Sequence, residues 1–251
     1  MKKKHIVTRR TAIITGLSSL GALVLNGCSK SSPPTYGNIL RMGDVLTYNA
    51  QRALLPGQSM AKEYTHSDIS SFPATGTTNP GDASGPYFSE DYARFQNKTF
   101  TDWGLKIEGR VAKPGYYPLA NLQRFPSRTQ ITRHTCEEGW TAIAEWTGVQ
   151  LSRVLQAAGI MPSARFVNFY AYDGYMESVD MLDAFHPQTI LAYGMNGRSL
   201  PLQHGAPLRV RIEKQIGYKS VKYLQRIVVT DEFVDNGYGK GFSGWSWYNG
   251  I

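Results

Sequence analysis

The sequence predicts an α+β fold, a strand-rich domain with few helices. Three observations indicate this class. Short segments in which apolar and polar residues alternate recur from Trp103 onward, segments with the apolar spacing of a helix are few, and no internal repeat occurs. Of the 251 residues, roughly 220 remain once an N-terminal signal is removed. This length suits one domain with a sizeable core or two small domains.

Residues 1–28 have the layout of an export signal. Five basic residues and no acidic residue accompany an apolar stretch from Ala12 to Leu25. That stretch is shorter than the roughly 20 apolar residues of a membrane-spanning helix, so its length favours a cleaved signal over the alternative of a membrane anchor. Removing the five basic residues lowers the net charge from +8 to +3. No dense basic run remains, and we expect no nucleic-acid partner.

Two details of the signal predict where the protein goes. Arg9-Arg10 is typical of a twin-arginine signal, which exports folded proteins that often already hold a cofactor. Leu25-Asn-Gly-Cys28 resembles a bacterial lipobox, in which the cysteine becomes the lipidated first residue. We therefore expect a periplasmic protein that is anchored to the membrane through Cys28 if this cysteine is acylated.

Little regular structure is predicted before Trp103. Residues 29–69 are expected to form a tether and an N-terminal segment. Residues 70–90 are rich in Gly, Pro, Ser and Thr, which predicts a long loop. A loop of this length in a compact domain is usually functional or disordered. The domain as a whole is expected to span residues 70–251.

The remaining elements are predicted in chain order. A strand over residues 103–111 is interrupted at Gly109. Residues 149–158 predict a short helix with one apolar face, and Gly159 is placed to end it. Further strands are predicted over residues 165–172, 190–195, 208–213 and 221–230. Asn196-Gly197 follows the second of these strands and predicts a hairpin.

Cys136 is the only thiol left once the signal is removed, because the chain has two cysteines and the other is Cys28. One thiol cannot form an internal disulfide, and a free thiol is a liability in an oxidising compartment. Cys136 is therefore either buried and inert or used in chemistry. Its ionisable neighbours are Arg133, His134, Glu137 and Glu138. This composition is unusual for an inert core site, and the cationic neighbours would lower the pKa of the thiol.

Three uses of Cys136 fit its neighbours: a nucleophile paired with a histidine, a redox sensor, or a metal ligand. A zinc site lacks a second cysteine or clustered histidines. A papain-like pairing lacks the local signature of a nucleophile. A metal whose other ligands come from an organic cofactor would need only one thiolate, and the sequence fits that case.

A set of motifs in the same region resembles the molybdenum-binding domain of the sulfite oxidase superfamily. The matching segments are Thr132–Trp140, Glu145–Leu155, Asp173–Ser178, His186–Gly197, Leu200–Arg209 and Gly217–Leu224. The similarity covers about residues 100–230 in the order typical of the family. It is greatest to the bacterial periplasmic branch that includes the catalytic subunit of protein-methionine-sulfoxide reductase. The resemblance implies a single strand-rich domain of the sulfite oxidase molybdopterin-binding type.

The resemblance also implies a cofactor, Mo-molybdopterin, and residues that hold it. Cys136 takes the position of the thiolate ligand to molybdenum and is the first catalytic residue. The expected cofactor contacts are Phe72, Pro73, Ala74, Ala171, Asp173, His204, Arg209, Ser220, Val221 and Lys222. Among these, His204 and Ala171 replace an asparagine and a threonine of the reductase. Read without the resemblance, Arg209 and Lys222 could face solvent, and Asp173-Gly174 could be only a turn.

The implied reaction is two-electron oxygen-atom transfer on a small sulfur compound or an N-oxide, with a separate chain carrying the electrons. No haem-binding Cys-x-x-Cys-His occurs, so the expected partner is a membrane b-type or soluble c-type cytochrome. Arg133 and Lys222 are expected to be catalytic, and with Lys219 they could form an anion pocket for sulfite. A more neutral pocket would suit oxidised methionine. The alternative is a lipid-anchored binding or assembly protein on the same scaffold without cofactor.

Overall fold

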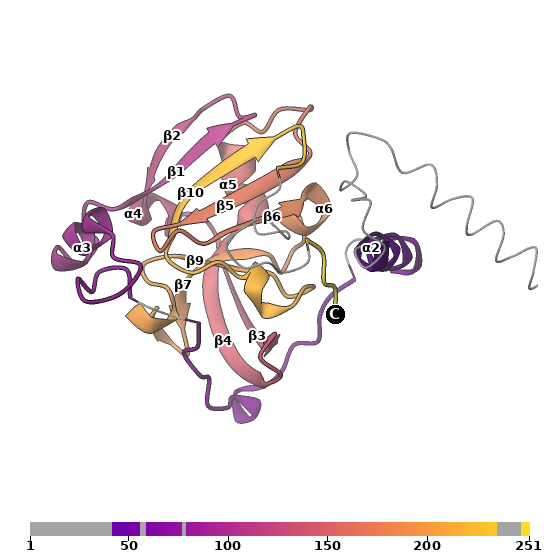
Figure 1. Cartoon of the computed structure of the whole chain (residues 1–251), viewed down its shortest axis with the longest axis horizontal. Helices are drawn as coiled ribbons and strands as arrows, with labels where there is room; N and C mark the ends of the chain where they lie inside the picture. Colours follow the sequence, from indigo (N-terminus) through magenta and orange to yellow (C-terminus); the bar gives the residue numbers. More distant parts are fainter. Residues whose placement is uncertain (1–41, 56–58, 77–78, 235–246) are drawn as a thin grey trace, which may run out of the picture.

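The computed structural model describes residues 42–55, 59–76, 79–234 and 247–251 (Figure 1). The expected export signal, with its twin-arginine pair and Cys28, lies outside the described residues. Within the described ranges, no helix has the length and apolar character needed to cross a membrane. Two β-sheets with a few short helices make up the body of the protein, which confirms the predicted α+β class.

The first sheet has five strands in the order β2-β1-β10-β5-β6. Their bounds are Gly115–Pro118 for β2, Gly104–Gly109 for β1, Leu224–Thr230 for β10, Phe166–Ala171 for β5 and Met176–Asp180 for β6. β1 and β10 are parallel, and the other neighbours are antiparallel. β1 ends at the predicted break because Gly109 has φ of +86° and a Cβ there would lie 2.0 Å from the carbonyl oxygen of Val229.

The second sheet has the order β3-β4-β7-β8, and β9 also pairs with β7. The strands are β3 Ser127–Thr135, β4 Thr141–Gln150, β7 Ile190–Met195, β8 Arg198–Ser199 and β9 Arg209–Arg211. The predicted hairpin is confirmed, because Asn196 and Gly197 have φ of +50° and +71° and join β7 to β8. The β3–β4 hairpin matters most for function, since its turn contains Cys136.

Short helices connect the strands. They are α2 Met42–Leu54, η2 His66–Asp68, α3 Glu90–Asn97, α4 Leu119–Leu122, α5 Leu151–Ala157, α6 Met181–Ala184, η3 Leu202–His204 and η4 Gly217–Lys219. α5 confirms the predicted helix, and Gly159 has the positive φ, +71°, of a residue that ends one. The helices α2 and α3 have no counterpart among the predicted elements.

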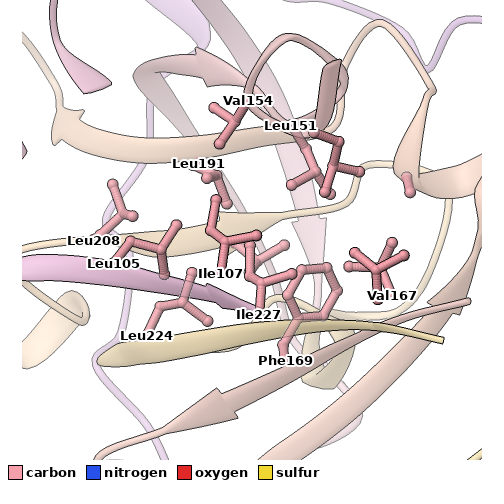
Figure 2. Close-up of a cluster of buried hydrophobic side chains, with 14 of the residues drawn as sticks. Leu105, Ile107, Leu151, Val154, Val167, Phe169, Leu191, Leu208, Leu224 and Ile227 are labelled. Atoms are coloured by element: carbon pink, nitrogen blue, oxygen red, sulfur yellow. The ribbon is translucent and has the colours of Figure 1, made fainter. Parts of the chain in front are cut away.

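The largest hydrophobic core lies between the two sheets and α5 (Figure 2). Figure 2 labels side chains from both sheets and the helix that meet there: Leu105, Ile107, Leu151, Val154, Val167, Phe169, Leu191, Leu208, Leu224 and Ile227. All ten are fully buried. Each such side chain contributes roughly 1.5–3 kcal/mol of burial free energy. The core therefore stabilises the packing of the two sheets, whose strands and connecting turns carry the site.

Strand β9 alternates as predicted, but both of its faces are buried. Leu208, Val210 and Ile212 belong to the main core. Arg209 and Arg211, which alternate with them, are 2% and 1% exposed. The alternative of a solvent-facing Arg209 is therefore wrong, because this face of β9 is buried too and the guanidinium packs over Trp146 at 4.9 Å.

An extended segment before the domain pairs with the edge of β3. Glu63 forms a bridge with Thr132, and the backbone N–H of Tyr64 donates to the carbonyl oxygen of Ile131 at 2.9 Å. Further along, the N–H of Ser70 donates to the carbonyl of Ile143 at 3.0 Å. These backbone contacts lead the chain to Phe72, which packs at the Cys136 end of the second sheet.

The helix α2 lies to one side of the body, close to the C-terminus (Figure 1). Its Arg52 forms ion pairs with Asp180 and Asp183, each at 3.0 Å, and Tyr48 donates to Asp180 at 3.0 Å. Trp247 packs edge-on against Tyr48 at 5.4 Å between ring centroids. These contacts tie the helix to α6 and to the C-terminal residues.

Candidate functional site

A cavity of about 540 Å³ lies at the end of β3, where several loops meet. It is lined by Phe72, Pro73, Thr75, Gly76, Tyr87, His134, Cys136, Glu137, Glu138, Trp140, Asp173, Tyr175, Arg209, Gly217, Tyr218, Ser220, Val221 and Lys222. The lining comes from the N-terminal loop, the β3–β4 turn, the β5–β6 turn, β9 and the η4 region. Its volume is within the range of small-molecule and cofactor sites.

Cys136 lies in the tight turn between β3 and β4. Its N–H donates to the carbonyl of Trp140 at 2.9 Å, and its own carbonyl accepts from the N–H of Gly139 at 3.1 Å. Gly139 permits this turn with φ of +90°. Cys136 is 7% exposed and lines the cavity. A single thiolate donor in a turn of this kind can occupy one coordination position and leave the others to a cofactor.

The electrostatics of Cys136 differ from the prediction. Burial raises the pKa of the thiol, and the nearby carboxylates of Glu137 and Glu138 raise it further. The expected lowering by cationic neighbours is wrong in sign because Arg133 does not line the cavity, while Sγ lies 3.6 Å from a carboxylate oxygen of Glu137. A thiol with a raised pKa stays protonated until it is ligated, so binding of a metal ion to Cys136 would release a proton.

Arg209 is a buried cation without an ion-pair partner in the described part of the chain. Its two terminal nitrogens donate to the carbonyls of His204 at 3.1 Å and Ser220 at 2.9 Å. Its Nε has no partner among the described residues. Burial, followed by the charge of Arg211, lowers the pKa of Arg209. An anion placed against this guanidinium would remove that electrostatic penalty.

Lys222 adds a second, half-buried cation. Its Nζ donates to the carbonyl of Thr75 at 2.7 Å, which joins the η4 region to the N-terminal loop. Burial, and next the charge of Arg209, lowers the pKa of Lys222 to about 7. Two cations that destabilise each other, with Ser220 and Val221 beside them, suit a phosphate. The donor set therefore fits a molybdopterin, with Cys136 for the metal and Arg209 and Lys222 for the phosphate.

The structure brings most of the predicted site residues together. Those that line the cavity are Phe72, Pro73, Cys136, Asp173, Arg209, Ser220, Val221 and Lys222. Asp173 lines the cavity and also forms the turn that the sequence offered as its alternative role, because its carboxylate accepts from the N–H of Tyr175 at 3.0 Å. Burial raises the pKa of its carboxyl.

Four predicted residues do not line the cavity. Ala74 is an exposed neighbour of the lining, and Ala171 is buried in the main core at the end of β5. His204 lies behind the lining, where its ring packs on Phe72 at 5.5 Å. Arg133 is exposed, and this corrects its expected catalytic position: strand alternation points His134 inward and its neighbour Arg133 outward.

His134 is the functional candidate that the sequence prediction missed. Burial, and then the charge of Arg211, lowers the pKa of its imidazole to about 2, so the ring is neutral. The signal that could have identified it is the same alternation, because residues 134 and 136 face one side of an extended chain. Trp140, Tyr175 and Tyr218 also line the cavity. Tyr175 follows the turn that Asp173-Gly174 indicates in the sequence, whereas no sequence pattern places Trp140 or Tyr218 there.

A buried cysteine and two cations, Arg209 and Lys222, line one cavity, and this arrangement fits a metal-carrying cofactor with an anionic group. Comparison with known families makes the class definite: the family described as oxidoreductase molybdopterin binding domain matches residues 92–238. The chain belongs to this family and is a molybdopterin-binding oxidoreductase of the sulfite oxidase type. This membership decides against the cofactor-free binding protein.

Two relatives and one solved structure are similar to this chain. A protein from Azospira oryzae with the name "Putative protein-methionine-sulfoxide reductase subunit YedZ1" is 30% identical over 96% of this chain and 87% of its own length. The protein-methionine-sulfoxide reductase catalytic subunit MsrP of Campylobacter jejuni is 31% identical over 55% of this chain, and the match spans about half of that relative, 52%. The sulfane dehydrogenase SoxCD of Paracoccus pantotrophus shares the fold, with a TM-score of 0.52 and 21% sequence identity. The matched region covers 81% of this chain and 58% of the SoxCD chain.

Proposed function

We propose that the protein reduces a small or protein-bound sulfoxide to the thioether by two-electron oxygen-atom transfer. The observation that carries this proposal is the composition of the cavity around Cys136. Phe72, Trp140 and Tyr87 supply aromatic surface, while Glu137 and Glu138 supply negative charge. Aromatic rings favour a thioether or sulfoxide sulfur, and the carboxylates disfavour an anionic substrate. The names of two relatives refer to reduction of the same class of compound.

The sulfite alternative has weaker support from the geometry. Of the three cations expected to form an anion pocket, Arg133 is exposed away from the cavity. Lys219 is completely buried and forms an ion pair with Glu177 at 2.6 Å. Lys222 remains, but it lies beside Arg209 on the side assigned to the cofactor phosphate. A sulfite dianion would have to bind beside two glutamates without a dedicated cation.

The chain's residues hold the cofactor and shape the substrate pocket. Cys136 would ligate the metal, and Arg209 and Lys222 would hold the phosphate with help from the backbone at Ser220 and Val221. The bound cofactor supplies the oxygen-atom transfer itself. In the overall reaction the S=O bond breaks, two electrons and two protons enter, and the products are a thioether and water. We propose that the electrons come from a separate b-type or c-type cytochrome.

The location of the protein is part of the proposal. The basic and apolar layout of residues 1–28 supports twin-arginine export to the periplasm, with residues 29–69 as a tether and N-terminal segment and residues 70–251 as the molybdopterin-binding domain. The lipobox-like sequence before Cys28 supports a lipid anchor. Mass spectrometry of the mature N-terminus tests both points: an acylated Cys28 is expected in the wild type, and an unmodified or uncleaved N-terminus would contradict the anchor.

The activity is tested with protein purified after export from a molybdenum-replete host. We expect about one molybdenum and one pterin per chain, and oxidation of reduced methyl viologen that depends on methionine sulfoxide. The same preparation should oxidise sulfite poorly with ferricyanide as acceptor. Cys136→Ser is the matched variant and should lose both reactions. Sulfite oxidation that is faster than sulfoxide reduction would refute the proposed direction and substrate.

A further inference from the structure

His134 lies beside Cys136 in the cavity, and neighbours on three sides hold its ring. The imidazole centroid is 5.1 Å from the ring of Phe72 and 5.4 Å from that of Trp140. On a third side lies Gly217, where a Cβ would be 2.3 Å from His134 Cε1 and 2.4 Å from Nε2. The ring can occupy this position only because residue 217 is glycine.

Arg211 determines which nitrogen of this ring carries the hydrogen. Its Nη1 lies 2.7 Å from His134 Nδ1, and both residues are buried. A guanidinium has hydrogen-bond donors only, so Nδ1 must be the acceptor. An imidazole whose Nδ1 accepts is neutral and carries its single hydrogen on Nε2. The tautomer therefore follows from the geometry of one contact.

Arg211 is itself fixed by the residues around it. Its Nε and Nη2 donate to the two carboxylate oxygens of Glu213 at 3.2 and 2.7 Å. Its guanidinium also stacks over Trp146 at 4.6 Å, and Glu213 accepts a further bond from Gln130 at 3.0 Å. Because Glu213 neutralises its charge, Arg211 orients His134 and is not an anion-binding group. In this respect it differs from Arg209, two residues earlier.

We propose that His134 donates its Nε2–H to an oxygen atom of the ligand beside Cys136, and that Arg211 is its positioning residue. Among the described residues, the hydrogen bond of the His134 ring is the one between Nδ1 and Arg211, so Nε2 has no protein partner there, and His134 lines the cavity. A neutral N–H donor suits an uncharged oxygen acceptor. Two groups have this chemistry: the sulfinyl oxygen of the substrate and a carbonyl oxygen of the pterin. The assignment to the sulfinyl oxygen rests on the proposed function, whereas the tautomer of His134 does not depend on that function.

The tautomer is tested first, on the full wild-type chain labelled with ¹⁵N-histidine and purified with its cofactor. Two-bond ¹H–¹⁵N spectra should include a His134 signal with unprotonated Nδ1 and protonated Nε2. His186 should give a second signal of the same kind, because its Nδ1 accepts from the N–H of Gln188 and its Nε2 donates to the carbonyl of Ser59. The His134 signal is the one that should be missing in His134→Phe. A His134 signal with the hydrogen on Nδ1, or with both nitrogens protonated, would overturn the proposal. This readout needs no activity, so it remains decisive if the proposed reaction is wrong.

The ligand is identified with His134→Phe, which keeps an aromatic ring and removes the donor. The matched control is His66→Phe, whose histidine side chain is 79% exposed. If the substrate oxygen is the acceptor, KM for methionine sulfoxide rises about tenfold, equal to about 1.4 kcal/mol, with kcat and pterin content unchanged. If the pterin is the acceptor, pterin content per chain falls instead. Wild-type values for KM and pterin content would overturn the proposal.

A second variant covers the case in which His134→Phe does not fold. Arg211→Lys keeps a donor and a charge but cannot form both bonds to Glu213. It should loosen His134 and raise KM or lower pterin content in the same direction, by a smaller factor. The ¹⁵N spectrum of this variant should show a mixture of tautomers. A single unchanged tautomer together with wild-type kinetics would remove Arg211 from the positioning role.

Discussion

Replacing Lys219 by methionine should destabilise the protein in a way that depends on pH. Lys219 ends η4 and is completely buried. Its Nζ donates to Glu177 at 2.6 Å and to the carbonyl of Ser178 at 3.1 Å. The preceding residue, Tyr218, lines the cavity, and its carbonyl accepts from the hydroxyl of Tyr175 at 3.1 Å. The ion pair therefore holds one wall of the site in place.

The size of the effect follows from the charge left behind. Removing one partner of a buried ion pair costs about 3–5 kcal/mol. Burial, which outweighs the opposing effect of Lys219, raises the pKa of Glu177 from 4.5 to about 7. The folded state then binds more protons, so this group's contribution to stability is complete below pH 4.5 and is lost as pH rises through 7, by about 3 kcal/mol. Without Lys219 the pKa of Glu177 rises further and the loss extends to higher pH.

Urea unfolding at pH 5 and pH 8 measures this dependence. The larger loss, approaching about 3–5 kcal/mol, is expected for Lys219→Met at pH 8. At this pH the wild-type Glu177 is ionised and paired, whereas the variant must either protonate the carboxyl or bury it as an unpaired charge. A smaller loss is expected at pH 5, where the carboxyl is protonated. Lys98→Met is the control, because Lys98 forms an exposed pair with Asp102 and should matter little at either pH. Equal losses for Lys219→Met at both pH values would refute the reasoning.

Two further variants test the site directly. Cys136→Ser should keep the fold, with a melting temperature close to that of the cofactor-free wild type, but should lose its molybdenum; metal analysis that finds about one molybdenum per chain would contradict the assignment of the ligand. Gly217→Ala should displace the ring of His134, because the added Cβ would lie 2.3 Å from Cε1. We expect a loss of roughly 1–3 kcal/mol in thermal unfolding and a raised KM for methionine sulfoxide. A variant that matches the wild type in both would show that the contact relaxes freely.

Much of the fold was predictable because its signals are local. Asn196-Gly197 specifies a hairpin turn by itself, and the apolar spacing of residues 149–158 specifies a helix. The helix α2 was not predictable, since its position depends on contacts of Arg52 with Asp180 and Asp183, about 130 residues away. Such contacts between distant segments leave no periodic pattern in either one.

The site was predictable only in part, for a related reason. Cys136 was identified because a single thiol is conspicuous, and Arg209 and Lys222 because they match family positions. Arg133 is close to Cys136 along the chain but not in the site, because a strand places neighbouring residues on opposite faces. His134 was missed because its importance comes from Arg211, which lies on another strand and becomes a neighbour only in the folded protein.

The two arginines of β9 provide a matched test of how charge is distributed around the site. Both are buried and both stack on Trp146, Arg209 at 4.9 Å and Arg211 at 4.6 Å. Arg211 is neutralised by Glu213, so Arg211→Met leaves a buried carboxylate and should cost about 3–5 kcal/mol in urea unfolding. Arg209→Met leaves the carbonyls of His204 and Ser220 without a hydrogen-bond donor but also removes a buried charge, so its net cost in stability should be smaller.

This order of the two costs applies to protein made in a host that lacks the cofactor. When the cofactor is present, Arg209→Met should lose pterin, because the cofactor phosphate would neutralise the charge of Arg209 as Glu213 neutralises that of Arg211. Equal costs for the two variants without cofactor would mean that Arg209 is already neutralised by the protein, and its assignment to the phosphate would fail.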